Sequence, residues 1–203
     1  MVTLTLVALN LAVFVLEVSL GGEVDAFVRR WGLVPNDLRG SEGQGALVTL
    51  LTSTFLHAGW LHLLSNLLYL TVFGLPVERR VGSARFSLLY LVSAVVGSLS
   101  YLVAQPTSQT PAVGASGAIA GVIAAHLVLY PGATLGSVAP VLFLSVVEST
   151  PTLLLLLLWL ATQVFSSVAS LTTSTGIAWW AHVGGFAAGL VLAPLLRKRR
   201  MAR

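Results

Sequence analysis

A serine and a histidine stand among small residues in two separate apolar stretches of the chain. Ser116 lies in segment 114–121, whose other members are glycine, alanine and isoleucine, and His182 lies in the glycine- and alanine-rich segment 181–189. A serine hydroxyl becomes a strong nucleophile when a neutral imidazole within hydrogen-bond reach takes its proton. The two side chains therefore predict a catalytic Ser116–His182 dyad. No aspartate or glutamate is expected in the external half of any membrane span near His182, so the third carboxylate of soluble serine hydrolases is missing.

His62 and Asn66 form a second polar pair, upstream of Ser116 and inside another apolar stretch. Their four-residue spacing puts both side chains on one face of a helix, and both can donate hydrogen bonds. Glycine beside Ser116 also favours free backbone N–H groups at the start of a helix. We expect His62, Asn66 and the Ser116 N–H to stabilise the oxyanion of a tetrahedral intermediate.

The composition determines the kind of fold that must hold these residues. Of 203 residues, 56% are hydrophobic and 9% are charged, whereas soluble domains carry roughly 25% charged residues. The chain is therefore predicted to be an all-α membrane protein with one domain, residues 1–203, embedded in the lipid bilayer. It contains no cysteine, which excludes thiol nucleophiles, thiolate metal sites and disulfides. We expect neither a metal nor another cofactor.

Six apolar stretches are long enough, at about 1.5 Å per residue, to cross the hydrocarbon core as helices. They are residues 3–20, 55–75, 86–104, 114–130, 151–168 and 179–196. Residues 21–54 are predicted to form an external loop with short interfacial helices, and residues 133–150 an interfacial connection. The serine- and threonine-rich residues 166–178 are expected to form a flexible loop, and the sequence leaves open whether this loop caps the site.

Basic residues orient this predicted bundle. With six spans both termini share one side, and eight of the eleven lysines and arginines fall there. These are Arg79, Arg80, Arg85, Arg197, Lys198, Arg199, Arg200 and Arg203, whereas Arg29, Arg30 and Arg39 lie opposite. The positive-inside rule predicts that both termini are cytoplasmic. We expect the membrane that holds the protein to be the cell membrane. The basic tail 197–203 is then an anchor beside anionic lipid rather than a nucleic-acid site.

In this orientation Ser116, His182 and His62 all lie near the external ends of their spans. Small residues at helical spacing predict that two of these spans touch, because glycine lets a neighbouring helix approach closely. One stripe consists of Gly114, Gly117 and Gly121, and the other of His182, Gly185 and Gly189. Contact between the stripes would bring the imidazole to the hydroxyl.

Other polar residues have structural interpretations. Glu17 is near the end of the first span, where the interface can hydrate it. Pro76 is expected to end the second span, and Glu78 and Arg79 to form an ion pair that fixes the following loop. His57 is expected to bond loop backbone. His126, near the cytoplasmic end of the fourth span, is expected to be hydrated or to cap the helix.

Taken together and in order, the motifs resemble those of the rhomboid intramembrane serine proteases. The matching elements are His-x-x-x-Asn at 62–66, Glu78-Arg79 followed by Gly82 and Phe86, Gly-Ala-Ser-Gly at 114–117, and Ala-His-x-x-Gly-x-x-x-Gly at 181–189. The resemblance implies a six-transmembrane-helix rhomboid-like bundle.

It also implies an activity and a substrate class. Ser116 would be the nucleophile and His182 the general base and acid, with His62, Asn66 and the Ser116 N–H at the oxyanion. The substrates would be single-span membrane proteins, cut in or near the transmembrane helix. The fifth span, with Trp159 and Phe165, would be the lateral gate.

The chain departs from the family at one position beside the dyad. Four residues after the serine the family often has an aromatic residue that packs on the catalytic histidine, and here the residue is Ala120. Another group, such as an aromatic residue from a different span, must then orient His182. This departure keeps open a rhomboid-like pseudoprotease that binds membrane helices without cutting them. A small transporter is disfavoured, because the halves show no inverted repeat.

Overall fold

The computed structural model describes residues 1–39, 47–134, 151–171 and 178–196. The basic tail 197–203, most of the connection 133–150 and the centre of the predicted loop 166–178 lie outside the described residues. Within them the chain forms helices and no β-strand beyond two isolated bridges.

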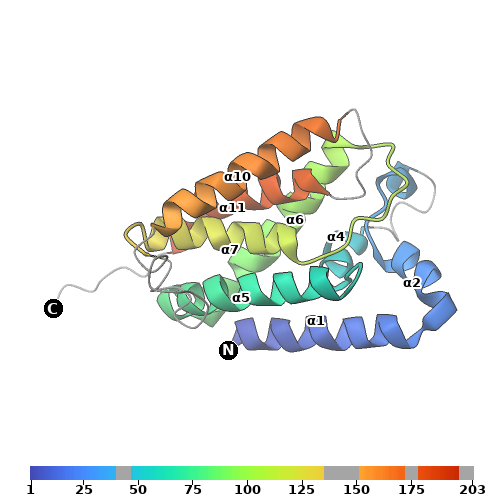
Figure 1. Cartoon of the computed structure of the whole chain (residues 1–203), viewed down its shortest axis with the longest axis horizontal. Helices are drawn as coiled ribbons and strands as arrows, with labels where there is room; N and C mark the ends of the chain where they lie inside the picture. The colour runs from blue at the N-terminus through green and yellow to red at the C-terminus, as the bar shows by residue number, and fades with distance from the viewer. Residues whose placement is uncertain (40–46, 135–150, 172–177, 197–203) are drawn as a thin grey trace.

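In the described residues, six apolar helices make up the bundle, and Figure 1 shows their arrangement. They are α1 Val2–Ser19, α5 Trp60–Val81, α6 Ser83–Ala104, α7 Ser116–Leu129, α10 Thr152–Ala169 and α11 Trp179–Leu196. Five of them are long and apolar enough to cross a membrane, and α7 is a shorter apolar helix. The prediction of an all-α membrane bundle is thus confirmed. The region between α1 and α5 contains the short helices α2 Val24–Trp31 and α4 Thr49–Thr52.

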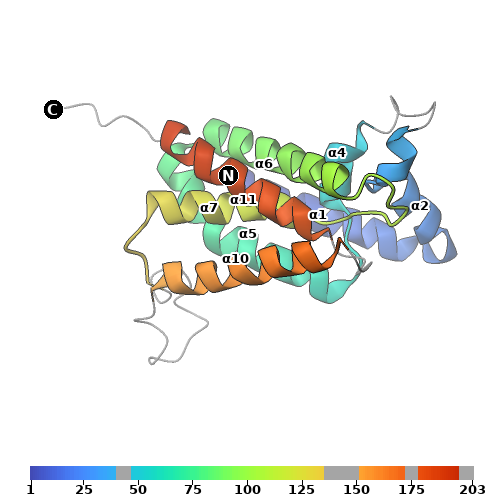
Figure 2. The ribbon, with the colours of Figure 1, turned by 90° about the horizontal axis from the view of Figure 1, so that it is seen from above.

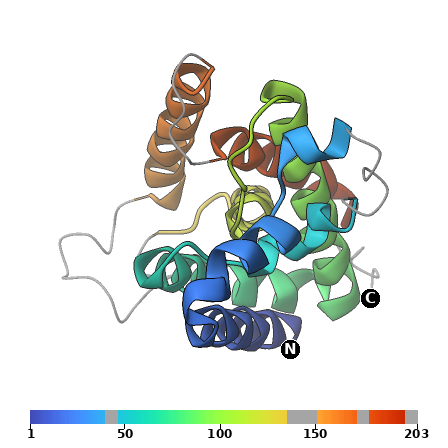
Figure 3. The ribbon, with the colours of Figure 1, turned by 90° about the vertical axis from the view of Figure 1, so that its right-hand side faces the viewer.

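Helix α7 lies at the centre of the bundle, as the views along and across it show (Figures 2 and 3). It packs against α5, α6 and α11, and eleven of its fourteen residues are buried. A helix that is apolar on all sides can be surrounded by protein or by lipid, and here it is surrounded by protein. Because neighbouring helices rather than lipid cover it, α7 can be shorter than its neighbours and still lie inside the bundle.

Glycines set the distance between α7 and α11. A Cβ atom on Gly185 would collide with the carbonyl oxygen of Gly117, and one on Gly189 with that of Gly121. The two backbones therefore touch along the stripes seen in the sequence. Gly114 was expected to take part in this contact but does not, because it precedes α7 in a turn with φ of 117°.

The boundaries of two helices differ from those expected. Helix α5 begins at Trp60 and continues through Pro76 to Val81. Gly82, with φ of 91°, ends it instead, and its N–H donates to the Glu78 carbonyl at 2.7 Å. Helix α10 extends to Ala169, so the first part of the expected loop is helical. There the Ser167 hydroxyl donates back to the Gln163 carbonyl, which satisfies it within the helix.

Two residues that were predicted to be hydrated are buried in the structure. Glu17 is 2% exposed and accepts the backbone N–H of His57 at 3.1 Å, because the turn before α5 covers the end of α1. His126 is also 2% exposed, with its ring between Phe73 and Tyr130. The described residues offer its ring nitrogens no hydrogen-bond partner. His126 is therefore packed against aromatic rings inside the bundle rather than exposed at the end of the helix.

Glu78 joins α1 to the turn between α5 and α6. Its buried carboxylate accepts the N–H groups of Val2 and Thr3 at 2.8 and 2.9 Å and the hydroxyls of Thr3 and Ser83 at 2.7 and 2.6 Å. The expected ion pair with Arg79 is absent from the described residues, where Arg29–Asp37 is the one salt bridge. Since α5 continues past this point, Glu78 faces α1 whereas Arg79 is exposed.

We expect Glu78→Gln to lower the free energy of unfolding by about 1–3 kcal/mol, because a neutral amide replaces two charge-assisted acceptors and puts a donor against buried N–H groups. Thermal unfolding in detergent measures the change. Glu23→Gln removes an exposed carboxylate and serves as the control. Equal melting temperatures for the two variants would contradict the role given to Glu78.

Candidate active site

Ser116 is the first residue of α7, directly after a tight turn. Gly114 supplies the positive φ that a side chain would disfavour, and Ala115 caps the helix. The first intrahelical bond runs from the Ile119 N–H to the Ala115 carbonyl at 2.9 Å. The amides before Ile119 have no acceptor within the helix, and the helix dipole is positive at this end. The half-buried Ser116 hydroxyl thus stands beside donors suited to a developing oxyanion.

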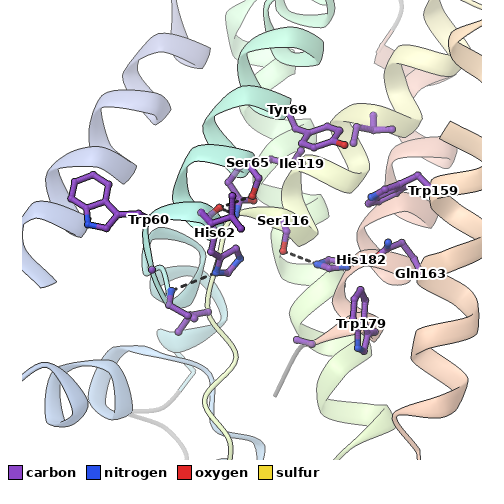
Figure 4. Close-up of a pocket in the computed structure, with 17 residues that line it drawn as sticks. Trp60, His62, Ser65, Tyr69, Ser116, Ile119, Trp159, Gln163, Trp179 and His182 are labelled. Atoms are coloured by element: carbon purple, nitrogen blue, oxygen red, sulfur yellow. Dashed lines mark hydrogen bonds between the residues drawn. The ribbon is translucent and has the colours of Figure 1, made fainter. Parts of the chain in front are cut away.

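His182 lies in the first turn of α11 and reaches across to this hydroxyl. The distance from His182 Nε2 to Ser116 Oγ is 2.7 Å, and the two side chains point toward each other (Figure 4). The glycine contacts between α7 and α11 bring the two helix ends together. The structure therefore joins two residues that are 66 positions apart in the sequence.

Gln163 of α10 holds the other side of the same imidazole. Its Oε1 lies 2.6 Å from His182 Nδ1, and its side chain is 6% exposed. Trp179 meets the imidazole edge-on with ring centroids 5.8 Å apart, and Trp159 lies at 6.3 Å. Gln163 and Trp159 of α10 and Trp179 of α11 itself thus contact His182, whereas the family's aromatic residue is missing. Gln163 was not among the predicted site residues, although a lone amide in a leucine-rich span indicates an inward-facing side chain.

His62 and Asn66 lie on the first turns of α5, on the side of Ser116 opposite to His182. His62 Nδ1 accepts the Ala58 N–H at 3.4 Å, so in the neutral ring the hydrogen is on Nε2. That Nε2 lies close to Gly114, where a Cβ atom would come within 2.7 Å of it. Asn66 is buried and donates one amide hydrogen to the His62 carbonyl at 2.8 Å. Its second amide hydrogen remains for another acceptor.

A cavity of about 750 Å³ connects these groups. Ser116, His182, Gln163, His62 and Asn66 all contribute to its lining, which is otherwise largely apolar or aromatic. A volume of this size is typical of ligand sites, which are roughly 300–1,000 Å³. The cavity lies between α5 on one side and α10 and α11 on the other, with α7 at its base (Figure 4).

His57 stands behind His62, in the turn that precedes α5. The two rings meet edge-on with centroids 5.2 Å apart, and the ring of Phe14 also meets that of His57 edge-on, with centroids 6.5 Å apart. Burial, followed by the neighbouring His62, lowers the pKa of His57 to about 4. The ring is therefore neutral at physiological pH and adds no positive charge beside the site.

A family model for the rhomboid domain matches residues 44–199, which include every site residue described above. The chain belongs to the rhomboid family. The resemblance seen in the sequence is thereby confirmed, and the matched residues of this rhomboid include α5, α7 and α11.

Curated relatives of this rhomboid carry different functional names. It is 40% identical over 114 residues, 56% of this chain and 21% of the relative, to the rhomboid protease GluP of Bacillus subtilis. It is 29% identical over 172 residues to RHOMBOID-like protein 12, mitochondrial, of Arabidopsis thaliana, covering 77% of this chain and 48% of the relative. It is also 32% identical over 113 residues to inactive rhomboid protein 1 of Drosophila melanogaster, covering 56% of this chain and 8% of the relative. The chain spans less than half the length of each.

Proposed function

We propose that this rhomboid is an intramembrane serine endopeptidase with a Ser116–His182 dyad. The observation that carries the proposal is the 2.7 Å hydrogen bond between Ser116 Oγ and His182 Nε2. It is the distance at which an imidazole can take a hydroxyl proton. The cavity beside it supplies room for a peptide bond and a water molecule.

The first half of the proposed reaction forms an acyl-enzyme. His182 Nε2 takes the Ser116 proton while Oγ attacks the carbonyl carbon of the scissile peptide. His62 Nε2–H, the free Asn66 amide hydrogen and the Ser116 N–H would then donate to the oxyanion. The bond from carbon to nitrogen breaks as His182 returns the proton to the leaving amine.

The second half releases the acyl group by hydrolysis. Water entering the cavity gives a proton to His182 Nε2, and the resulting hydroxide attacks the ester carbon. The same donors hold the second oxyanion, and Ser116 Oγ leaves with the proton from His182. Of the protein's own groups, only Ser116 and His182 exchange protons in these steps, and the oxyanion donors stabilise the negative charge.

Membrane helices are the substrates that this cavity favours. Its walls include Tyr69 of α5 and Trp159 of α10, so a largely apolar segment could enter between the two helices. Phe165, expected at the same gate, is 77% exposed and does not line the cavity. We therefore propose that single-span membrane proteins enter past Trp159 and are cut in or near the transmembrane helix, where the chain is locally unwound.

The proposed orientation puts both termini in the cytoplasm and the protein in the cell membrane. It follows from the distribution of lysine and arginine between the two sides of the bundle. Ser116 and His182 then lie toward the external face, at the ends of α7 and α11 that water can reach. No nucleic-acid partner is proposed, because the basic tail follows directly after the apolar residues of α11.

A pseudoprotease is the alternative, and the inactive rhomboid relative keeps it open. Such a protein would bind a membrane helix without cutting it. The hydrogen-bonded Ser116 and His182 favour the protease, and Gln163 compensates for the aromatic residue missing at Ala120. Binding of a transmembrane peptide without any cleavage would favour the alternative.

The test is to incubate the purified protein, in detergent or in vesicles, with a panel of single-span reporter proteins. Mass spectrometry of the products locates each cut. We expect cleavage within or next to the transmembrane helix of at least one reporter. Cuts confined to soluble loops, or reporters that bind and stay intact across the panel, would count against an intramembrane endopeptidase.

A further inference from the structure

Gln163 is the one buried amide on α10 that touches the dyad, and the proposed proton transfers leave it unused. It contacts His182 Nδ1, on the side of the imidazole away from Ser116. Soluble serine hydrolases have a carboxylate at this position, which selects the productive tautomer of the histidine. The titratable groups that line this cavity are His62, His182 and Tyr69, and no acidic side chain is among them.

The neighbouring threonine determines which way the Gln163 amide points. Thr162 donates its hydroxyl hydrogen to the Trp159 carbonyl at 2.6 Å, so its oxygen can only accept a further hydrogen bond. Gln163 Nε2 lies 3.3 Å from that oxygen and donates to it. In the reversed amide, two acceptors would face each other at Thr162. The amide oxygen of Gln163 therefore faces His182.

An oxygen at this place determines where the imidazole carries its hydrogen. Gln163 Oε1 can only accept, so a bond at 2.6 Å requires a hydrogen on His182 Nδ1. In a neutral imidazole Nε2 is then bare. A bare Nε2 accepts the Ser116 hydroxyl hydrogen, which is the state that a general base needs.

We propose that Gln163 is a positioning residue that holds His182 in the Nδ1–H tautomer and aims its Nε2 at Ser116. This inference rests on the proposed protease activity and adds a third member, on α10, to the Ser116–His182 pair. Gln163 bonds to His182 Nδ1, whereas Ser116 Oγ bonds to Nε2. It acts through the imidazole, as an amide counterpart of the carboxylate in soluble enzymes.

The effect on catalysis is measured with Gln163→Leu, which keeps the bulk of the side chain and removes its acceptor. We expect kcat for reporter cleavage to fall about 100-fold, the lower end of what general acid–base catalysis contributes. KM should change little, because substrate binding does not involve Nδ1. Gln163→Glu restores an acceptor and should recover most of kcat. The matched control is Ser167→Ala, which removes a buried hydroxyl one turn further along the same face of α10 and should leave kcat unchanged.

The tautomer itself is measured by NMR on protein labelled with 15N-histidine, in which the chain's four histidines are separated by comparison with His182→Ala. We expect the hydrogen of His182 on Nδ1 in the wild type and in Gln163→Glu, and its loss from that site in Gln163→Leu. A wild-type His182 with its hydrogen on Nε2 overturns the inference, even if Gln163→Leu fails to fold. So does a folded Gln163→Leu with wild-type kcat. If Ser116→Ala still cleaves reporters, the proposed protease function is wrong. The NMR measurement still decides whether Gln163 sets the tautomer of His182.

Discussion

Ser116→Ala should abolish cleavage of a single-span reporter, lowering kcat by a factor of about 10⁴ or more, since removing the nucleophile of a serine hydrolase leaves only residual catalysis by the remaining groups. The substitution removes one half-buried oxygen and leaves the α7–α11 glycine contacts in place. The variant should therefore insert and unfold like the wild type. Product formation followed by gel and by mass spectrometry measures the loss.

His182→Ala should lose activity to a similar degree, because the dyad acts as a unit and the two losses are not additive. Combining it with Ser116→Ala should therefore produce no further decrease. Ser65→Ala is a suitable control, since its hydroxyl lines the cavity but donates to the His62 carbonyl at 2.9 Å. Cleavage by Ser116→Ala at the wild-type rate, in protein free of contaminating protease, would refute the dyad.

Gly185→Val should destroy both the fold and the activity. A Cβ atom at this position collides with the Gly117 carbonyl oxygen, and backbone atoms on both sides leave no flexible side chain to move away. We expect a loss of about 3 kcal/mol or more in the free energy of unfolding, at the upper end for overpacking. Separating α7 from α11 also separates Ser116 from His182. Thermal unfolding in detergent and reporter cleavage measure the two effects.

Ala187→Val is the matched control, because it adds similar bulk to α11 at an exposed position two residues away. It should melt and cleave like the wild type. If Gly185→Val behaved in the same way, the close approach of α7 and α11 could not be what aligns the dyad.

The sequence predicted the bundle and the segments of the dyad because these depend on local pattern. Apolar length indicates a membrane helix, and glycine spacing indicates which face approaches a neighbour. Ser116 and His182 meet where the two stripes predicted they would. Composition and residue spacing were enough to predict the membrane helices and the contact between α7 and α11, since each of these signals lies within one helix.

The features that sequence analysis missed depend on which helices are neighbours. A single glutamine in α10 indicates a side chain facing inward, but nothing local says that His182 is its partner. Glu17 was expected to be hydrated at the interface and Glu78 to pair with Arg79. Their burial instead depends on the turn before α5 and on the start of α1. Pro76 was expected to end α5, and the helix instead continues to a glycine cap.

The most direct measurement of the central claim is the reaction with a fluorophosphonate, which traps an activated serine hydroxyl as a stable adduct. The labelled residue is identified by mass spectrometry. The 2.7 Å contact between Ser116 Oγ and His182 Nε2 predicts one adduct, on Ser116, whose formation is strongly slowed in His182→Ala. No adduct on Ser116, or labelling of Ser116 at the same rate without His182, would contradict the account.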